Sequence, residues 1–222
     1  MKVPQLKHES LRDAVLRLIE EALLNGELQP GDRIVEARLA RQAGISRGPV
    51  REAIRQLVGE GILVSYPSRG TFVTQWTTRA VEEAYTLRAV LERFTIQEVA
   101  KRVTPEEIAQ LQATVDEMDR CARLNDTRAL IRLDVQFHEQ LYVFSGHSLL
   151  QKMLSQLRRR LYCLLAMDRG FAVHRDEIAA DHQLIIDTLK AGDVTAAGEI
   201  IEGHILTTGA EVVEQVRDWS KE

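Results

Sequence analysis

The sequence has few of the residues that mark secreted, membrane or disulfide-stabilised proteins. It contains two cysteines, Cys121 and Cys163, which are too few and too far apart for a disulfide framework or a zinc ribbon. Aromatic residues make up 5% of the chain, and no stretch approaches the roughly 20 consecutive apolar residues that a membrane span needs. The N-terminal residues are charged throughout and do not resemble a signal peptide. We therefore expect a reduced, cytoplasmic protein that makes no membrane contact.

Acidic residues slightly outnumber basic ones, 33 to 29, but one segment is rich in arginine. The 222 residues carry a formal net charge of −4, and 45% of them are hydrophobic, which suffices for a folded core. Residues 33–70 nevertheless contain seven arginines against three glutamates and no lysine. A short arginine-rich segment on an acidic chain is a candidate phosphate-facing surface, although a solvated charged face would have the same composition.

The two parts of the chain differ in hydrophobic periodicity. The first part predicts three short helices and a two-stranded hairpin, with helices at 10–25, 36–43 and 47–60 and strands at 62–66 and 71–75. The second part predicts helices alone, joined by short connections, at 79–102, 105–124, 127–145, 148–168, 174–191 and 193–218. We expect a mainly α protein with one domain at 1–75, a linker at 76–79 and an antiparallel all-α helical bundle at 80–222.

Residues 36–63 have the order of a helix-turn-helix. Gly44 permits a tight turn, and Ser46 stands where it can cap the following helix. That helix has an apolar inward stripe of Val50, Ile54 and Leu57 and an opposite basic face of Arg47, Arg51 and Arg55. A recognition helix in a DNA major groove has this pattern, and the hairpin after it would be a wing with Arg69 and Gly70 at its tip. The alternative is an amphipathic helix with three solvated arginines.

These motifs resemble a known family. The segment 30–74, with S-R-G-P-V-R-E-A at 46–53 and R-G-T-F-V at 69–73, is similar to the winged helix-turn-helix of GntR-type bacterial transcription regulators. The helical remainder resembles the FCD effector domain of the FadR-like subgroup. The resemblance implies a ligand-responsive regulator, a repressor, that binds a palindromic double-stranded DNA operator as a homodimer and senses a small organic acid.

The resemblance also implies DNA contacts. In the family, the residues that match Ser46, Arg47, Arg51 and Gly70 contact DNA. Many members have Thr at the position of Gly48, and its absence removes a hydroxyl that could bond to phosphate. The DNA-binding set that we predict is Ser46, Arg47, Gly48, Arg51, Arg55, Arg69 and Gly70.

Four residues that can bind a metal are predicted to face the interior of the bundle. Asp134 and His138 stand four residues apart, one turn apart on one face of a helix, and His182 and His204 lie among isoleucines on two other helices. A carboxylate and three imidazoles suit a divalent transition metal such as Zn, Ni or Mn. The alternative for each histidine is a hydrogen-bonded core residue. The resemblance favours a metal, because many FCD domains use D-x-x-x-H and two later histidines as ligands.

The resemblance further implies effector-binding roles for Arg88 and His147. Arg88 matches the family's R-x-x-L-E, in which the arginine often faces the effector, while the alternative is a surface arginine paired to Glu92. His147 stands where many members have Asn, which leaves its role open. We do not expect an enzyme, because the sequence lacks H-E-x-x-H, a phosphate-binding glycine loop and a nucleophile elbow. The alternatives are a metal-ion sensor, a metal-dependent hydrolase with an appended winged helix, and a winged helix used for protein contact.

Overall fold

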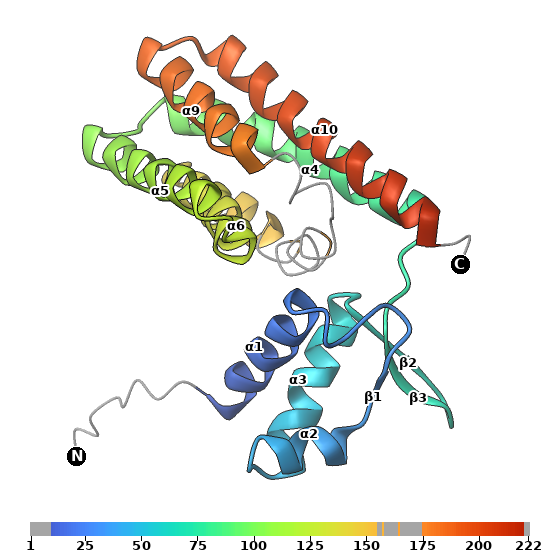
Figure 1. Cartoon of the computed structure of the whole chain (residues 1–222). Helices are drawn as coiled ribbons and strands as arrows, with labels where there is room; N and C mark the ends of the chain where they lie inside the picture. Colours follow the sequence, from blue (N-terminus) through green and yellow to red (C-terminus); the bar gives the residue numbers. More distant parts are fainter. Residues whose placement is uncertain (1–9, 155–156, 158–163, 165–174, 220–222) are drawn as a thin grey trace, which may run out of the picture. The chain divides into compact units, whose positions relative to one another are not determined.

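The computed structural model describes residues 10–154, 157, 164 and 175–219. The chain divides into two compact units, Met1–Gln75 and Trp76–Glu222. The mainly α architecture predicted from the sequence is confirmed (Figure 1). The elements in chain order are α1 (Leu11–Leu24), β1 (Arg33–Ile34), α2 (Glu36–Gln42), α3 (Arg47–Gly59), β2 (Leu63–Tyr66), β3 (Gly70–Val73), α4 (Thr78–Ala100), α5 (Pro105–Arg123), α6 (Thr127–Phe144), α9 (Arg175–Ala191) and α10 (Val194–Trp219).

In the first unit, α1 and α2 both pack against α3. The sequence defines the ends of these helices well. The Ser10 side chain caps α1 by accepting the backbone N–H of Asp13 at 3.1 Å. Gly44, with φ +66°, makes the predicted reversal between α2 and α3 in a backbone region that glycine enters without strain. The core between the helices consists of Val15, Ile19, Leu23, Val50, Ile54 and Leu57.

The predicted two-stranded hairpin is confirmed, because β2 and β3 pair in the antiparallel direction, but the sequence analysis missed a third strand. The sheet has the order β1-β3-β2, and Arg33 on β1 pairs with Phe72. A strand of two residues is too short to show alternation, so only its tertiary pairing reveals it. Ser46 does occupy the N-cap position of α3 with extended backbone, but its side chain makes no capping hydrogen bond.

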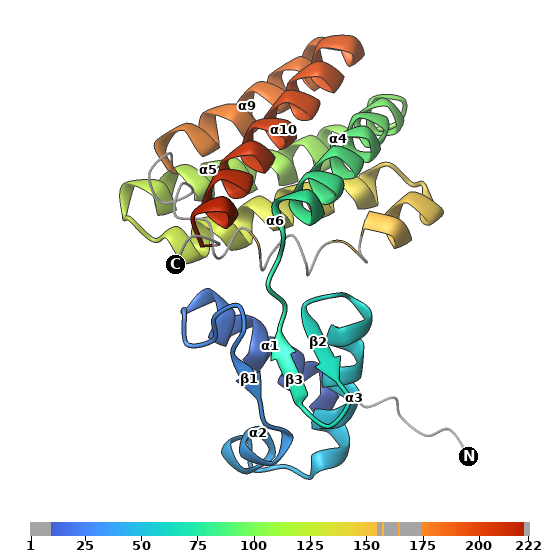
Figure 2. The same cartoon turned by 90° about the vertical axis from the view of Figure 1, so that its right-hand side faces the viewer.

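In the second unit, α4 and α10 lie side by side along much of their length, and α5 packs against α6 and α9 (Figures 1 and 2). Helix α4 begins at Thr78, inside the segment predicted as a linker. Residues 148–154 are helical, while the rest of the helix predicted at 148–168 lies almost wholly outside the described residues. Within the described part of the chain, no helix is long and apolar enough to cross a membrane.

Candidate metal centre and nucleic-acid interface

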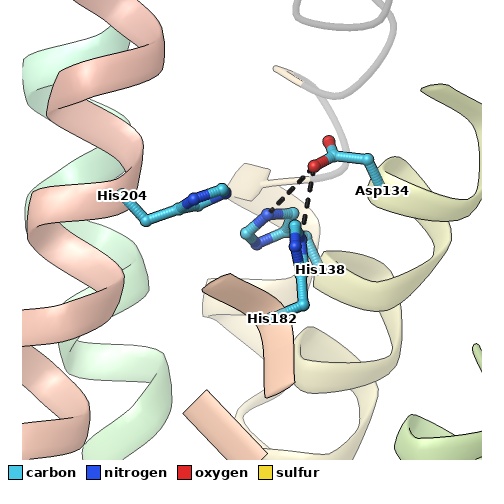
Figure 3. A group of neighbouring side chains, drawn as sticks. All are labelled: Asp134, His138, His182 and His204. Atoms are coloured by element: carbon cyan, nitrogen blue, oxygen red, sulfur yellow. Dashed lines mark ion pairs between the residues drawn. The ribbon is translucent and has the colours of Figure 1, made fainter. Parts of the chain in front are cut away.

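The four predicted metal ligands converge on one point of the bundle (Figure 3). Asp134 and His138 come from α6, His182 from α9 and His204 from α10. One candidate ligand atom from each residue lies within 4.8 Å of the others. The first three side chains are buried, and 10% of the His204 side chain is exposed.

Hydrogen bonds fix which nitrogen of two imidazoles faces this point. His182 Nδ1 donates to the carbonyl oxygen of Ile178 at 2.7 Å, because a carbonyl can only accept. His138 Nδ1 donates to Oε2 of Glu92 at 2.5 Å. Each ring therefore directs its Nε2 at this point, and histidine commonly binds a metal through one ring nitrogen while the other donates a hydrogen bond. Burial, the largest effect, lowers the pKa of His138 to about 4 despite Glu92, so this ring is neutral at physiological pH.

These inward nitrogens are incompletely satisfied by the protein. His138 Nε2 and His182 Nε2 are buried without a hydrogen-bond partner among the described residues. His182 Nε2 lies 3.3 Å and His138 Nε2 4.0 Å from Oδ1 of Asp134. Burial would raise the pKa of Asp134, but His182 and His138 outweigh it and hold that pKa well below its usual range. Three imidazoles and an ionised carboxylate fit a divalent transition metal, which would also satisfy the two orphaned nitrogens.

A cavity of about 250 Å³ adjoins this cluster. Asp134 and His204 line it and also belong to the cluster, so a molecule in the cavity would reach two of the four candidate ligands. Its other walls come from α9 and α10, namely Glu177, Ile178, Asp181, Ile200, Thr207, Thr208 and Glu211. No arginine or lysine is among these described lining residues. His204 Nδ1 lies 3.5 Å from Oδ2 of Asp181 and lowers the pKa of that carboxyl.

Helix α3 of the first unit presents the predicted basic face. Its apolar stripe is fully inward, with Val50 and Leu57 completely buried. Arg47, Arg51 and Arg55 are all exposed on the other side of the helix. Arg51 Nε lies 3.4 Å from Oε2 of Glu36, a long and exposed contact that contributes little to stability. The arginine face is therefore available to an anionic partner.

The wing adds further positive charge. Arg69 at its tip is exposed and stands 5.6 Å over the ring of Tyr66. Gly70 has φ +106°, and a Cβ there would come within 3.1 Å of Nε of Arg33. Arg33, on the unpredicted strand β1, thus lies beside the wing tip. The arginine count of residues 33–70 includes it, but only the pairing of β1 with β3 places it there.

Family models match both units. The model described as bacterial regulatory proteins, gntR family, matches residues 11–73, and the FCD domain model matches residues 83–207. The chain belongs to the GntR family of regulators with an FCD domain. It is a transcription regulator of this type and not an enzyme, because its domains and its named relatives are those of transcription regulators.

Relatives of this GntR regulator align over most of its length. It is 31% identical to the HTH-type transcriptional regulator YdhC of Bacillus subtilis over 190 residues, which cover 84% of each chain. It is 26% identical to a probable D-xylose utilization operon transcriptional repressor of Paenarthrobacter nicotinovorans, over 90% of this chain and 88% of that one. The solved structure of Escherichia coli McbR/YncC superposes with a TM-score of 0.82 and 26% identity, covering 94% of this chain and 99% of that chain.

A buried carboxylate that the sequence analysis did not count as a site residue supports the candidate metal-binding residues of this GntR regulator. Glu92 on α4 is fully buried and bonds to His138, to the Tyr142 hydroxyl at 2.7 Å and to the Arg88 guanidinium. Burial would raise the pKa of Glu92, but Arg88, His138 and Tyr142 together lower it to about 2. The signal in the sequence was two charged residues, at 88 and 92, on the otherwise buried face of α4.

The structure separates the two predicted effector residues from the cavity. Arg88 is 3% exposed and pairs with Glu92, so the pairing alternative was right but its surface location was wrong. Arg88 is linked to the candidate metal-binding residues by the hydrogen bonds that Glu92 makes with it and with His138, and its charge also helps to lower the pKa of Asp134. His147 stands in the turn after α6, where its ring meets Phe94 edge-on at 5.6 Å and its Nδ1 accepts the N–H of Leu150. Neither residue is among the described residues that line the cavity.

Proposed function

We propose that this chain is a ligand-responsive repressor that binds a palindromic operator as a dimer. Helix α3 and the wing supply the DNA contacts, with Ser46, Arg47, Gly48, Arg51 and Arg55 on the helix and Arg69 and Gly70 on the wing. The observation that carries this part is the exposed arginine face over a fully buried apolar stripe. The repressor name of the Paenarthrobacter relative supports the direction of regulation.

The second unit, in this proposal, binds a divalent transition metal and a small carboxylate. Asp134, His138, His182 and His204 hold the metal, and the two orphaned Nε2 atoms are the observation that supports it. When bound, the metal would supply positive charge beside the cavity, whose described lining residues include no arginine or lysine. That charge would attract an anionic effector.

Arg88 has an indirect part in this proposal. It keeps Glu92 ionised, and Glu92 holds the His138 ring with Nε2 directed at the cluster. His147 remains a proposed contributor through the turn that follows α6, at the end of the helix that carries His138.

The experiment is a thermal-shift screen of small carboxylates with the protein loaded with Zn, Ni or Mn and, in parallel, stripped with EDTA. Because a ligand stabilises the state that it binds, we expect a carboxylate to raise the melting temperature of the loaded protein and to leave the stripped protein unchanged. Replacing His182 and His204 together with Ala should empty the site, as elemental analysis would show. For the metal content alone, His147→Asn is the matched control, because it removes a histidine that is not among the four candidate ligands.

Three outcomes would contradict parts of this proposal. Unchanged metal content in the double variant would reject the ligand assignment, provided that circular dichroism shows the variant folded. A carboxylate that stabilises the stripped protein equally well would reject the metal-assisted site. Stabilisation by metal alone, with no carboxylate effective, would favour the metal-ion sensor, for which four protein ligands within 4.8 Å are sufficient.

A further inference from the structure

Arg33 is held on the outer face of the wing by strand β1. Its neighbour Ile34 is 6% exposed and belongs to the core of the unit, while Arg33 itself is exposed. Because successive side chains of a strand point to opposite faces of the sheet, the buried Ile34 directs Arg33 outward. Strand β1 lies beside β3 (Figure 2), and Arg33 is opposite Phe72. Core packing and strand pairing therefore fix the place of this arginine.

The Arg33 guanidinium fills the space beside Gly70 in which any other residue would have a side chain. Gly70 precedes Phe72 by two residues on β3, which is about 7 Å along an antiparallel strand and within reach of an arginine side chain. A Cβ at position 70 would lie 3.1 Å from Nε, 3.3 Å from Nη2 and 3.6 Å from Cζ of Arg33. A molecule that touches this side of Gly70 would therefore touch the guanidinium as well.

The positive charge of Arg33 has no acidic partner among the described residues. The carboxylate of the adjacent Asp32 instead accepts the backbone N–H of Gln29 at 2.8 Å. Residues 61–75, which include β2 and β3, contain no aspartate or glutamate. Arg69, next to Gly70 in the chain, is exposed as well. Two positive charges thus lie at the wing tip without an acidic partner from the wing, so this surface attracts anions.

We propose that Arg33 binds a phosphate of the DNA backbone beside the wing tip, and that position 70 is a glycine in part because the guanidinium needs its space. A guanidinium suits this task, since it is always charged and presents several N–H donors to phosphate oxygens. A phosphate contact fixes the placement of the protein on the duplex without reading the sequence. The proposal rests on the proposed function in that the wing must touch DNA. It adds a contact from β1, an element outside the predicted DNA-binding set.

The test measures binding of the full-length protein to two duplexes at several salt concentrations, by fluorescence anisotropy. One duplex comes from upstream of the protein's own gene, and the other has the same bases in scrambled order. We expect Arg33→Ala to weaken binding to both duplexes by about 10-fold for each copy of the chain bound, because each copy loses one hydrogen bond from a charged donor. The slope of log affinity against log salt should fall by roughly 0.9 for each copy.

Two variants serve as controls. Arg12→Ala removes an exposed arginine of α1 and should leave both affinities nearly unchanged. Arg33→Lys keeps the charge, so it should retain the salt slope while losing part of the affinity, because lysine lacks the planar fork of donors. Circular dichroism checks that each variant is folded.

A double-mutant cycle tests the role of Gly70. Alanine at φ +106° is strained in any background, but its methyl group meets a guanidinium only where Arg33 is present. We therefore expect Gly70→Ala to weaken DNA binding about 3-fold more in the natural protein than in Arg33→Ala. An equal loss in the two backgrounds would overturn the assigned role of Gly70.

Three outcomes would overturn the phosphate contact. Unchanged affinity and slope in Arg33→Ala would make Arg33 a solvated surface residue. A loss confined to the upstream duplex would indicate contact with a base instead. If the natural protein bound neither duplex, this contact and the proposed DNA-binding function would both be rejected, whereas failure of Arg33→Ala alone would leave the assignment of α3 unaffected.

Discussion

At the residue scale, Glu92 connects the buried Arg88 to the candidate metal-binding residues. Its carboxylate balances the charge of the buried Arg88 guanidinium and orients His138. Like His182, His138 is almost completely buried. Removing one member of a buried ion pair leaves the other charge without compensation, at a cost of about 3–5 kcal/mol. Glu92 therefore stabilises the fold and also holds the His138 ring in place.

We predict that Glu92→Gln lowers the free energy of unfolding by on the order of 3 kcal/mol. The pH dependence gives a sharper test in metal-free protein. A carboxyl whose pKa falls from its ordinary value of 4.5 to about 2 on folding contributes stability that is complete above pH 4.5 and is lost as the pH falls toward 2. Urea unfolding at a series of pH values should show this loss in the natural protein, and a smaller loss in the variant.

Glu82→Gln is the control for this prediction, because it removes the same charge from an exposed position of α4. It should leave the unfolding free energy nearly unchanged. An equal effect of the two substitutions would show that the buried network contributes nothing of its own.

The residue scale also shows where prediction from sequence stops. The i and i+4 spacing of Asp134 and His138 places both on one face of a helix, so their proximity follows from local geometry. Glu92 lies 46 residues before His138, and only the packing of α4 against α6 joins them. The sequence pattern pairs Arg88 with Glu92 one turn away, but it does not reveal that both are buried.

At the scale of elements, helices were easier to predict than the sheet. Thr104 and Glu107 form a complete capping box, with bonds of 3.2 and 2.9 Å, which defines the start of α5. Strand β1 has no such local signal, because two residues become a strand only through their pairing with β3. The missed strand matters for function, since it brings Arg33 to the wing tip.

Helix α3 supplies the prediction that belongs to this scale. Arg47→Ala should abolish specific operator binding while the fold survives, because Arg47 is exposed in the first turn and supports no core contact. Arg51→Ala, as a phosphate contact, should weaken binding to all sequences and reduce the slope of log affinity against log salt by about one unit. Fluorescence anisotropy with operator and scrambled duplexes would measure both.

Arg12→Ala on α1 serves as the control, since it removes one exposed arginine from another helix of the same unit. Full operator affinity in Arg47→Ala would reject α3 as the reading helix. If all three variants lost operator affinity to the same extent, the effect would come from the overall charge and not from contacts in the groove.

At the scale of the whole molecule, regulation requires that the effector bind the DNA-competent and DNA-free states with different affinity. We predict that a carboxylate found in the thermal-shift screen lowers operator affinity by about 5- to 150-fold, which is the range of a typical coupling free energy. By linkage, operator DNA should weaken carboxylate binding by the same factor. Titrations in both directions would measure the two factors.

The variant lacking His182 and His204 provides the internal control, because it should bind operator and ignore the carboxylate. Unequal factors in the two titrations would exclude a simple two-site coupling. Operator affinity that follows free metal, with no organic ligand present, would identify the ion itself as the signal.

The shared carboxylate of Glu92 limits which substitutions the sequence can accept during evolution. Three donors, from Arg88, His138 and Tyr142, depend on one acceptor inside a dry interior. A substitution at any one of these positions would leave a buried polar group without its partner, so the four residues should be substituted together in related sequences. A related sequence with an apolar residue at position 92 should therefore also lack an arginine at the position of Arg88.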